Sequence, residues 1–258
     1  MSDDSRPSRT EPGAEPRTAL RTAAVIPAAG RGVRLGPGAP KALRALNGTP
    51  MLIHAVRALA ASRAVSLVVV VAPPDGAPEV KSLLDAHALP DRTDFLVVPG
   101  GESRQESVRL GLDALPPDYD IVLVHDAARP LVPVDTVDAV IQAVRDGAPA
   151  VVPALPLADT VKEVEPATTP GDPEPVLATP ERARLRAVQT PQGFDRRTLV
   201  RAHETVTESV TDDAGMVEQL GDRVVVVPGH EEAFKVTRPL DLVLAEAVLA
   251  RRRLNDGF

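Results

Sequence analysis

A glycine-rich stretch near the start of the chain carries the residue types needed to hold a phosphate group. In AAVIPAAGRGVRLGPGAPKAL, an apolar run precedes glycines, prolines, Arg34 and Lys41, with no acidic residue among them. Glycine loses more backbone freedom on ordering than any other residue, so such a loop needs a compensating ligand. Backbone N–H groups around Gly30 and Gly32 can surround phosphate oxygens, and the two cations can neutralise them. The stretch therefore predicts a phosphate-binding loop.

Two common phosphate-binding motifs do not fit this loop. A dinucleotide-binding turn needs G-x-G-x-x-G opening directly into a helix, whereas Gly36-Pro37-Gly38-Ala39-Pro40 prevents a helix from starting here. The chain also lacks G-x-x-x-x-G-K-[ST], the sequence of the Walker-type loop. An extended loop whose backbone contacts phosphates remains, and its alternative is a basic surface segment without a ligand.

Three further stretches place polar residues where predicted strands end. In VLVHDAARPLV, Asp126 follows an apolar run, where it can meet a ribose hydroxyl or a phosphate-bound Mg²⁺, or cap the following turn. In GGESRQESV, Gly100 and Gly101 can bring the backbone close to a flat base, while Ser103 can cap a helix. In FKVTRPLDL, Lys235 ends a short predicted strand, although an isolated lysine is usually solvated.

The elements that must position these residues alternate between apolar strands and amphipathic helices. Strands are predicted at 23–28, 66–72, 95–99, 120–125, 149–155 and 223–229, and helices at 50–62, 79–88, 103–115, 133–146, 197–207, 212–220 and 240–254. SLVVVVA shows no polar alternation, as strands covered on both faces require. This order predicts an α/β fold, with a doubly wound, mostly parallel Rossmann-like sheet flanked by helices. Its ligands should gather at the carboxyl ends of the strands.

The alternation stops between residues 156 and 186. PLADTVKEVEPATTPGDPEPVLATPERARLR mixes short β-like pieces with many prolines and has no core-sized apolar run. A surface loop is the simplest interpretation, but the length favours a protruding β-arm that holds a partner. We expect residues 21–258 to form a single domain that carries this arm. Residues 1–20 are polar and rich in proline, which predicts a disordered tail and no signal peptide.

Composition excludes several classes of protein. The 258-residue chain has a formal net charge of −7, which argues against a general nucleic-acid binder. It contains no cysteine, which excludes disulfides, zinc–thiolate sites and iron–sulfur clusters and fits the reducing cytoplasm. No apolar run approaches the ~20 residues of a membrane span. With 43% hydrophobic but only 2% aromatic residues, the core must consist of Val, Leu, Ile and Ala.

Several ordered motifs resemble the 2-C-methyl-D-erythritol 4-phosphate cytidylyltransferase family of the non-mevalonate isoprenoid pathway. They are PAAGRGVRL, PKAL, GGESRQESV, VHDAARP, DTVK, TPQGF, TDDAG and KVTRPLDL, between about residues 22 and 254. The glycine loop alone would indicate only the wider nucleotidyltransferase superfamily, whereas the later motifs make the resemblance specific. The resemblance implies an enzyme that joins CTP to methylerythritol phosphate, releasing pyrophosphate, with Mg²⁺ or another divalent cation.

The resemblance also implies roles for individual residues. Arg34 and Lys41 match the cations that hold the CTP triphosphate, and with Asp126 and Lys235 they are the candidate catalytic residues. The candidate cytidine-binding residues are Ala28, Ala29, Gly30, Gly32, Gly101, Glu102 and Ser107. The candidates for binding the polyol phosphate are Arg129, Thr160, Arg182, Thr190 and Thr211. No protein ligand for a metal is predicted, because the CTP phosphates would carry Mg²⁺ into the vicinity of Asp126.

The segment 156–186 matches an arm that family members exchange across a homodimer, where it contributes an arginine to the neighbouring site. Counting back from TPQ makes this Arg182. Arg184 and Arg186 are alternatives, because the arm is a few residues longer than in comparable members. Glu102 also departs from the family pattern, since aspartate is more usual there. The implied partners are CTP, a polyol phosphate and a second copy of the chain, with neither nucleic acid nor membrane.

Two other functions remain open from the sequence. One is a related cytidylyltransferase for another polyol phosphate, such as ribitol 5-phosphate, since a few residues around Arg129, Thr160 and Thr190 would decide the substrate. The other is a catalytically silent nucleotide-binding protein, which the presence of both Arg34 and Lys41 disfavours. A phosphate monoester has a second pKa of about 6, so the transfer needs no strong general base.

Overall fold

The computed structural model describes residues 20–30, 40–207 and 210–255. Two sequence expectations therefore lie outside the described residues: the disordered tail, apart from Leu20, and the glycine loop between residues 31 and 39 with Gly32 and Arg34. None of the described helices is both long enough and apolar enough to cross a membrane.

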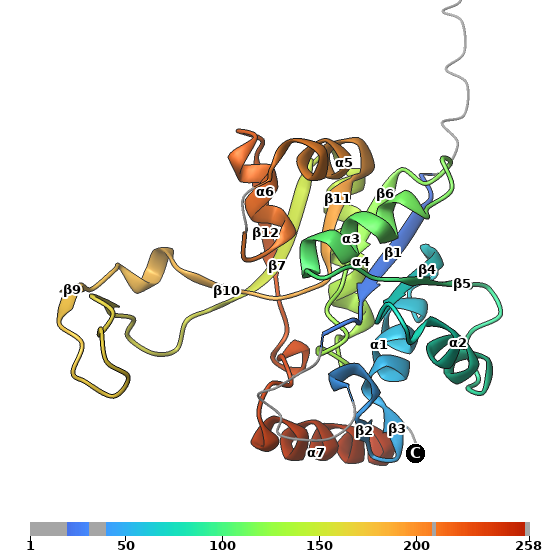
Figure 1. Ribbon diagram of the computed structural model, residues 1–258, viewed down its shortest axis with the longest axis horizontal. Helices are drawn as coiled ribbons and strands as arrows, with labels where there is room; N and C mark the ends of the chain where they lie inside the picture. Colours follow the sequence, from blue (N-terminus) through green and yellow to red (C-terminus); the bar gives the residue numbers. More distant parts are fainter. Residues whose placement is uncertain (1–19, 31–39, 208–209, 256–258) are drawn as a thin grey trace, which may run out of the picture.

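A central sheet of eight strands organises the chain (Figure 1). Seven strands lie in the order β10-β7-β11-β6-β1-β4-β5, and β12 pairs with β7. Strands β1, β4, β5 and β6 are mutually parallel where they pair, whereas β11 runs antiparallel to both β6 and β7. The strands are β1 (Thr22–Pro27), β4 (Val65–Ala72), β5 (Asp94–Pro99), β6 (Ile121–Val124), β7 (Ala150–Pro156), β10 (Arg186–Val188), β11 (Gln192–Asp195) and β12 (Val224–Pro228).

Helices cover both faces of this sheet, as the uninterrupted apolar strands predict. On one face, α1 (Met51–Ala60), α2 (Ala77–Asp85) and α4 (Val134–Arg145) share a core with alternate side chains of β1, β4 and β6. On the other face, α3 (Arg104–Asp113), α5 (Arg196–Thr205) and α6 (Asp213–Gln219) pack against the remaining side chains of the same strands. The predicted doubly wound α/β fold is therefore confirmed.

A third, smaller core supports the C-terminal helix α7 (Pro239–Asn255). Leu46 and Met51 pack there with Val236 and Ala245. Leu46 belongs to a small hairpin of β2 (Ala45–Leu46) and β3 (Thr49–Pro50), which the sequence analysis does not predict. Pro50 consequently ends a strand and caps α1, instead of being the first residue of that helix as expected.

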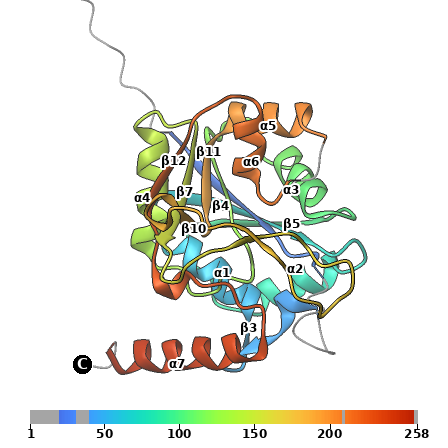
Figure 2. The same cartoon turned by 90° about the vertical axis from the view of Figure 1, so that its left-hand side faces the viewer.

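The segment predicted to be an arm leaves the body of the molecule after β7 (Figures 1 and 2). It contains β8 (Glu163–Val164) and β9 (Val176–Ala178), which pair with each other in a separate two-stranded sheet. The short helix η3 (Arg182–Arg184) follows, and β10 returns the chain to the central sheet beside β7. Val176 and Leu177 are 57% and 60% exposed, so within this chain the arm covers little of its own apolar surface.

The close packing of α3 on β1 depends on the absence of a side chain at Gly111. A Cβ atom there would lie 2.5 Å from Cγ1 of Val25. We expect Gly111→Ala to lower the free energy of unfolding in urea by about 1–3 kcal/mol, because overpacking outweighs the ~1 kcal/mol gained in helix propensity. Adding Val25→Ala should relieve the overlap, so the double variant should be less destabilised than the sum of the two single variants. Strict additivity would contradict this account.

Candidate active site

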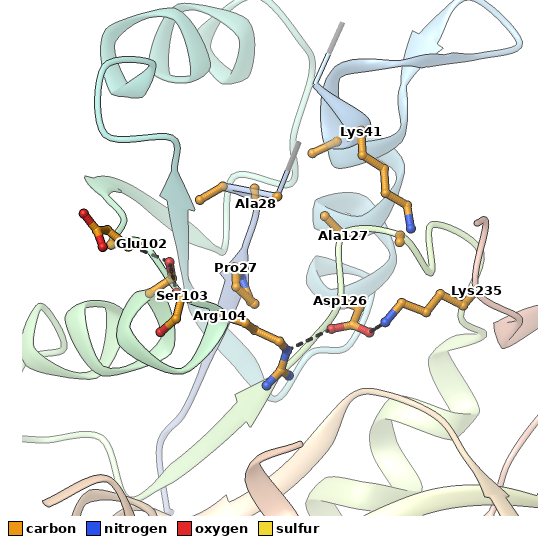
Figure 3. A pocket seen from close by; sticks show the side chains of 15 residues that line it. Pro27, Ala28, Lys41, Glu102, Ser103, Arg104, Asp126, Ala127 and Lys235 are labelled. Carbon is orange, nitrogen blue, oxygen red and sulfur yellow. Dashed lines mark hydrogen bonds and ion pairs between the residues drawn. The ribbon is translucent and has the colours of Figure 1, made fainter. Parts of the chain in front are cut away.

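A pocket opens at the carboxyl ends of β1, β5 and β6, where the sequence analysis expects a ligand (Figure 3). Four segments line it: the residues that end β1 and follow it, the short helix η2 (Lys41–Leu43), the start of α3 with its preceding loop, and the loop after β6. Lys235 completes the lining from a segment far along the chain. The lining residues are Pro27, Ala28, Ala29, Gly30, Lys41, Ala42, Gly101, Glu102, Ser103, Arg104, Ser107, Asp126, Ala127, Ala128 and Lys235.

One wall of the pocket is formed by backbone in tight contact. The amide of Gly100 donates to the carbonyl of Ala72 at 2.7 Å, and a Cβ at Gly100 would lie only 2.9 Å from that oxygen. The hydroxyl of Ser107 is used inside this wall, since it donates to the carbonyl of Ser103 and accepts from the amide of Gly101. A side chain at Gly100 would displace this backbone, and the bonded loop leaves Gly101 and Ser107 in the pocket lining, where the base contact is predicted.

Ser103 caps α3, which confirms the structural interpretation of this residue. Its hydroxyl accepts from the amide of Glu106 at 3.0 Å, and the Glu106 carboxylate accepts from the amide of Glu102 at 2.8 Å. The first bond caps the helix, and the second differs from a capping box only in that Glu106 accepts from the residue before the N-cap. The Glu102 side chain points away from Asp126 (Figure 3), so exchange of aspartate for glutamate here changes little in the pocket.

The Asp126 carboxylate is the centre of charge in the pocket (Figure 3). One oxygen lies 2.7 Å from the Lys235 ammonium, and the other lies 3.5 Å from Nε of Arg104. Burial alone would raise the pKa of Asp126, but Arg104 and Lys235 outweigh that effect and hold its pKa well below the usual range. The carboxylate therefore stays ionised and acts as an anchor for two cations.

Lys235 reaches the pocket differently from the way the sequence analysis expects. The short strand predicted to end at Lys235 is wrong, because the chain forms the short helix η4 (Glu231–Ala233) and then continues without strand pairing. A single backbone bond, from the amide of Val236 to the carbonyl of Ala128 at 2.8 Å, fixes this segment beside the loop after β6. One bond to a loop does not extend a sheet, which explains the missing strand.

Behind Asp126, a hydrogen-bonded network fixes the loop that carries it. The fully buried His125 ring donates from Nε2 to the carbonyl of Arg129 at 3.1 Å, so in the neutral ring Nδ1 accepts from the Thr190 hydroxyl at 3.0 Å. The Thr190 oxygen in turn accepts from the amide of Asp126 at 3.0 Å. Burial lowers the pKa of His125 to about 4. This histidine is therefore neutral near pH 7 and supports the loop.

Five residues expected to bind the polyol phosphate lie outside the pocket lining of this chain. Thr190 is engaged by His125 and Asp126, and Arg129 donates to the carbonyls of Ala233 at 2.7 Å and Val188 at 3.2 Å. The other three, Thr160, Arg182 and Thr211, are exposed.

Among these exposed residues, Thr160 and Arg182 belong to the arm, where the Arg182 guanidinium donates to the carbonyl of Ala158. The nucleotide-binding candidates within the described residues thus come together, whereas the polyol-phosphate candidates do not.

Arg104 is the charged residue of the pocket lining that the sequence analysis misses. Besides Asp126, its guanidinium contacts Asp213 at 2.7 Å, and Asp213 accepts a hydrogen bond from His203. The arginine stands in the GGESRQESV motif, but in the first turn of a helix it resembles an ordinary solvated residue. Its partner Asp213 is 109 positions away in the sequence, so no local signal could have revealed the pair.

The pocket offers little to hold a metal by itself. No group of three or more His, Asp or Glu side chains with the arrangement of a metal site occurs in the described ranges 20–30, 40–207 and 210–255. Both oxygens of Asp126 face cations of the chain. This donor set fits Mg²⁺ that arrives on the phosphates of a nucleotide, because Mg²⁺ is commonly held by one or two carboxylates together with substrate phosphates.

A doubly wound sheet with a cation-lined pocket at its carboxyl edge defines a nucleotide-binding α/β enzyme. Residues 22–251 match the sequence model of the family described as 2-C-methyl-D-erythritol 4-phosphate cytidylyltransferase. The chain belongs to this family of nucleotidyltransferases. The resemblance noted in the sequence is thereby confirmed.

Curated relatives agree with this assignment. The 2-C-methyl-D-erythritol 4-phosphate cytidylyltransferase of Streptomyces avermitilis is 89% identical over 258 residues, covering 100% of both chains. That of Streptomyces coelicolor is 83% identical over 270 aligned residues, again covering 100% of both.

Solved structures share the fold. The 4-diphosphocytidyl-2C-methyl-D-erythritol synthase of Anaerococcus prevotii superposes with a TM-score of 0.75 at 28% identity, covering 90% of this chain and 99% of that one. The 2-C-methyl-D-erythritol 4-phosphate cytidylyltransferase of Thermus thermophilus gives a TM-score of 0.69 at 34% identity, covering 89% and 98%.

The neutral state of His125 should appear in the pH dependence of stability. Below about pH 6.5 the unfolded histidine binds a proton, whereas the folded one does so only near pH 4, so acid favours the unfolded chain. We expect the free energy of unfolding in urea to fall by about 3 kcal/mol from this group between pH 6.5 and 4. His125→Gln should be less stable at pH 7.5 but should lose this part of the slope. An unchanged slope in the variant would refute the assignment.

Proposed function

We propose that this chain joins CTP to 2-C-methyl-D-erythritol 4-phosphate, giving CDP-methylerythritol and pyrophosphate. The observation that carries this proposal is the pocket that combines Lys41, Lys235 and an ionised Asp126 at the carboxyl edge of the sheet, in a chain matched by the family over residues 22–251. An oxygen of the methylerythritol phosphate attacks the α-phosphorus of CTP. The bond from that phosphorus to the bridging oxygen breaks, and pyrophosphate leaves with the electron pair.

The chemistry asks mainly for positioning and charge stabilisation. The attacking phosphate is largely ionised near neutral pH, since its second pKa is about 6, so no strong base is required. The buried histidine beside the pocket agrees with this, because its two ring nitrogens are engaged by the carbonyl of Arg129 and the hydroxyl of Thr190. Mutual repulsion of two polyanions is the main obstacle, and fixed cations at the transferred phosphorus lower it. We assign that task to Lys41 and Lys235, together with Arg34, which lies outside the described residues.

A divalent cation fits this arrangement as part of the nucleotide. When bound to the triphosphate, Mg²⁺ would neutralise the oxygens of the leaving pyrophosphate, with Asp126 as the nearest candidate ligand of the chain. The other residues of the pocket would contact the nucleoside part of CTP. Ala28, Ala29, Gly30 and Gly101, which line the pocket, would bind the cytidine. Glu102 and Ser107 would support them through the loop backbone.

We infer that the chain is a homodimer whose arms complete the neighbouring sites. Thr160 and Arg182 lie on the arm, outside the pocket lining of their own chain. The arm extends away from the body in Figure 1, and in Figure 2 the same side of the molecule faces the viewer, with the arm in front of the body. Its exposed Val176 and Leu177 offer apolar surface that a second copy can cover. In this proposal Arg182 reaches the partner's methylerythritol phosphate, with Arg184 and Arg186 as the alternative arginines.

The cytoplasmic location of the protein stays a prediction from the sequence.

Removing the Lys41 ammonium should collapse turnover. We expect Lys41→Ala to lower kcat for pyrophosphate release from CTP plus methylerythritol phosphate roughly a hundredfold, because one preorganised charge contact contributes about 3 kcal/mol. Lys81→Ala is the matched control, since Lys81 lies on α2 and pairs with Asp85 at 2.8 Å, outside the pocket lining. Ribitol 5-phosphate and reactions lacking either substrate run in parallel. Near-normal kinetics in Lys41→Ala, or preference for ribitol 5-phosphate, would contradict the proposal.

The dimer can be tested by mixing defective subunits. If Arg182 acts across the interface, a heterodimer of an Arg182→Ala subunit and a Lys41→Ala subunit contains one intact site, which should give up to about half the wild-type activity. Each variant alone should be nearly inactive. The heterodimer is isolated with two different affinity tags before assay. Activity no higher than that of the separate variants would exclude Arg182 as the exchanged residue, and the same mixture with Arg184→Ala or Arg186→Ala then tests the alternatives.

A further inference from the structure

We propose that Arg104 is a positioning residue of the transfer reaction, held by the buried Asp213–His203 pair so that it fixes Asp126 and, through it, Lys235. The inference rests on the proposed function, because it assigns a task to residues of the same pocket. It concerns a chain of contacts that runs from the core to the pocket: His203, Asp213, Arg104, Asp126 and Lys235.

The far end of this chain is fully buried. The Asp213 side chain has no exposed surface, and that of His203 is 2% exposed. A carboxylate only accepts hydrogen bonds, so Nε2 of His203 donates to Asp213, at 3.1 Å. Burial alone would raise the pKa of Asp213, but the bond from His203 and the charge of Arg104 reverse that effect and lower its pKa. An ionised carboxylate inside the protein is costly unless it has partners, and Arg104 supplies the charged one.

The position of Asp213 is itself fixed by the sheet. It begins α6, where Asp212 caps the helix by accepting from the amide of Gly215 at 3.0 Å. Gln192 of β11 holds the same turn, since its amide nitrogen donates to Asp212 at 2.6 Å and its oxygen accepts from the amide of Ala214 at 3.1 Å. β11 is paired with β6, the strand that leads to Asp126. The positions of Asp213 and Asp126 are thus both set by the paired strands β11 and β6.

Arg104 connects these two carboxylates with a rigid, planar group. One terminal nitrogen contacts Asp213 at 2.7 Å, while Nε lies 3.5 Å from Asp126. A guanidinium bound at one end by a buried carboxylate cannot turn freely toward an incoming phosphate, as a solvated arginine would. It therefore presents a fixed edge to Asp126. The second oxygen of Asp126 then lies 2.7 Å from the Lys235 ammonium. The ammonium is therefore positioned before the substrates bind.

The charges of this cluster match that task. Arg104 and Lys235 balance the two carboxylates of the cluster, Asp126 and Asp213, and Arg129 beside Asp126 adds a third positive charge. The surplus favours binding of polyanionic substrates, while the carboxylates keep the cations from collapsing onto the phosphates in unproductive positions. Asp213 itself does not line the pocket, whereas Arg104, which it contacts at 2.7 Å, does.

The test is Asp213→Asn in the full-length protein, assayed by pyrophosphate release from CTP and methylerythritol phosphate. We expect kcat to fall about 10- to 100-fold, with KM for CTP changed less than about threefold, because the reacting groups lose alignment while triphosphate contacts persist. Arg104→Lys should show the same split, since lysine keeps the charge but not the planar fork that spans two carboxylates. Arg104→Lys, whose side chain is 34% exposed, also serves as the test if Asp213→Asn folds poorly. Asp113→Asn is the control, because Asp113 pairs with Arg109 on the outer side of α3, outside the pocket lining.

A double-mutant cycle separates positioning from simple structural support. If Asp213 acts through Arg104, the loss of kcat in Asp213→Asn plus Arg104→Ala should be clearly smaller than the product of the two single losses. His203→Gln, whose amide can still donate to Asp213, should retain more kcat than His203→Ala at matched thermal stability. Losses of melting temperature without loss of kcat, or multiplicative losses in the cycle, would overturn the inference. A wild-type enzyme without turnover would instead refute the proposed function and this inference with it.

Discussion

The site depends on keeping one carboxylate ionised where burial disfavours charge. Asp126 lies at the edge of the sheet with a side chain only 12% exposed, yet cations face both of its oxygens. Desolvation and Coulomb attraction oppose each other here, and the depressed pKa of Asp126 shows that attraction wins. A carboxylate in this state is a poor proton acceptor but a strong anchor. Its contribution is to hold Arg104 and Lys235 in place before any substrate arrives.

The parallel sheet makes this arrangement possible, because it brings distant segments to one edge. Asp126 follows β6, Arg104 follows β5 in the first turn of α3, and Lys235 comes from the segment before α7. The last of these has no strand of its own and is fixed by two bonds, from Val236 to Ala128 and from Arg129 to Ala233. The half-buried Arg129 thus holds a backbone segment beside the site and lies outside the pocket lining.

Much of the fold could be predicted because its signals are local. The valine-rich run of β4 and the amphipathic pattern of α1 and α4 reflect burial that any sheet of this kind requires, so their bounds agree with the sequence within a few residues. β11 could not be predicted, since Gln192–Asp195 holds one large apolar residue and becomes a strand only through its neighbours β6 and β7. The site likewise contains residues with a local sequence signal and residues without one. Asp126 stands in a recognisable local motif, whereas the pairing of Arg104 with Asp213 is a long-range contact without a sequence pattern.

The arm, unlike the rest of the chain, is not stabilised by a core of its own. Its two strands are of two and three residues, and a two-stranded sheet of this size has little stability by itself in water. The exposed apolar side chains on β9 destabilise the isolated arm further. A second copy would cover them, and in the proposed dimer the same event would deliver Thr160 and Arg182 to a pocket that holds the nucleotide-binding candidates but not the arm residues of its own chain. Assembly and completion of the site would then be one step, so that a lone subunit could bind CTP without transferring it.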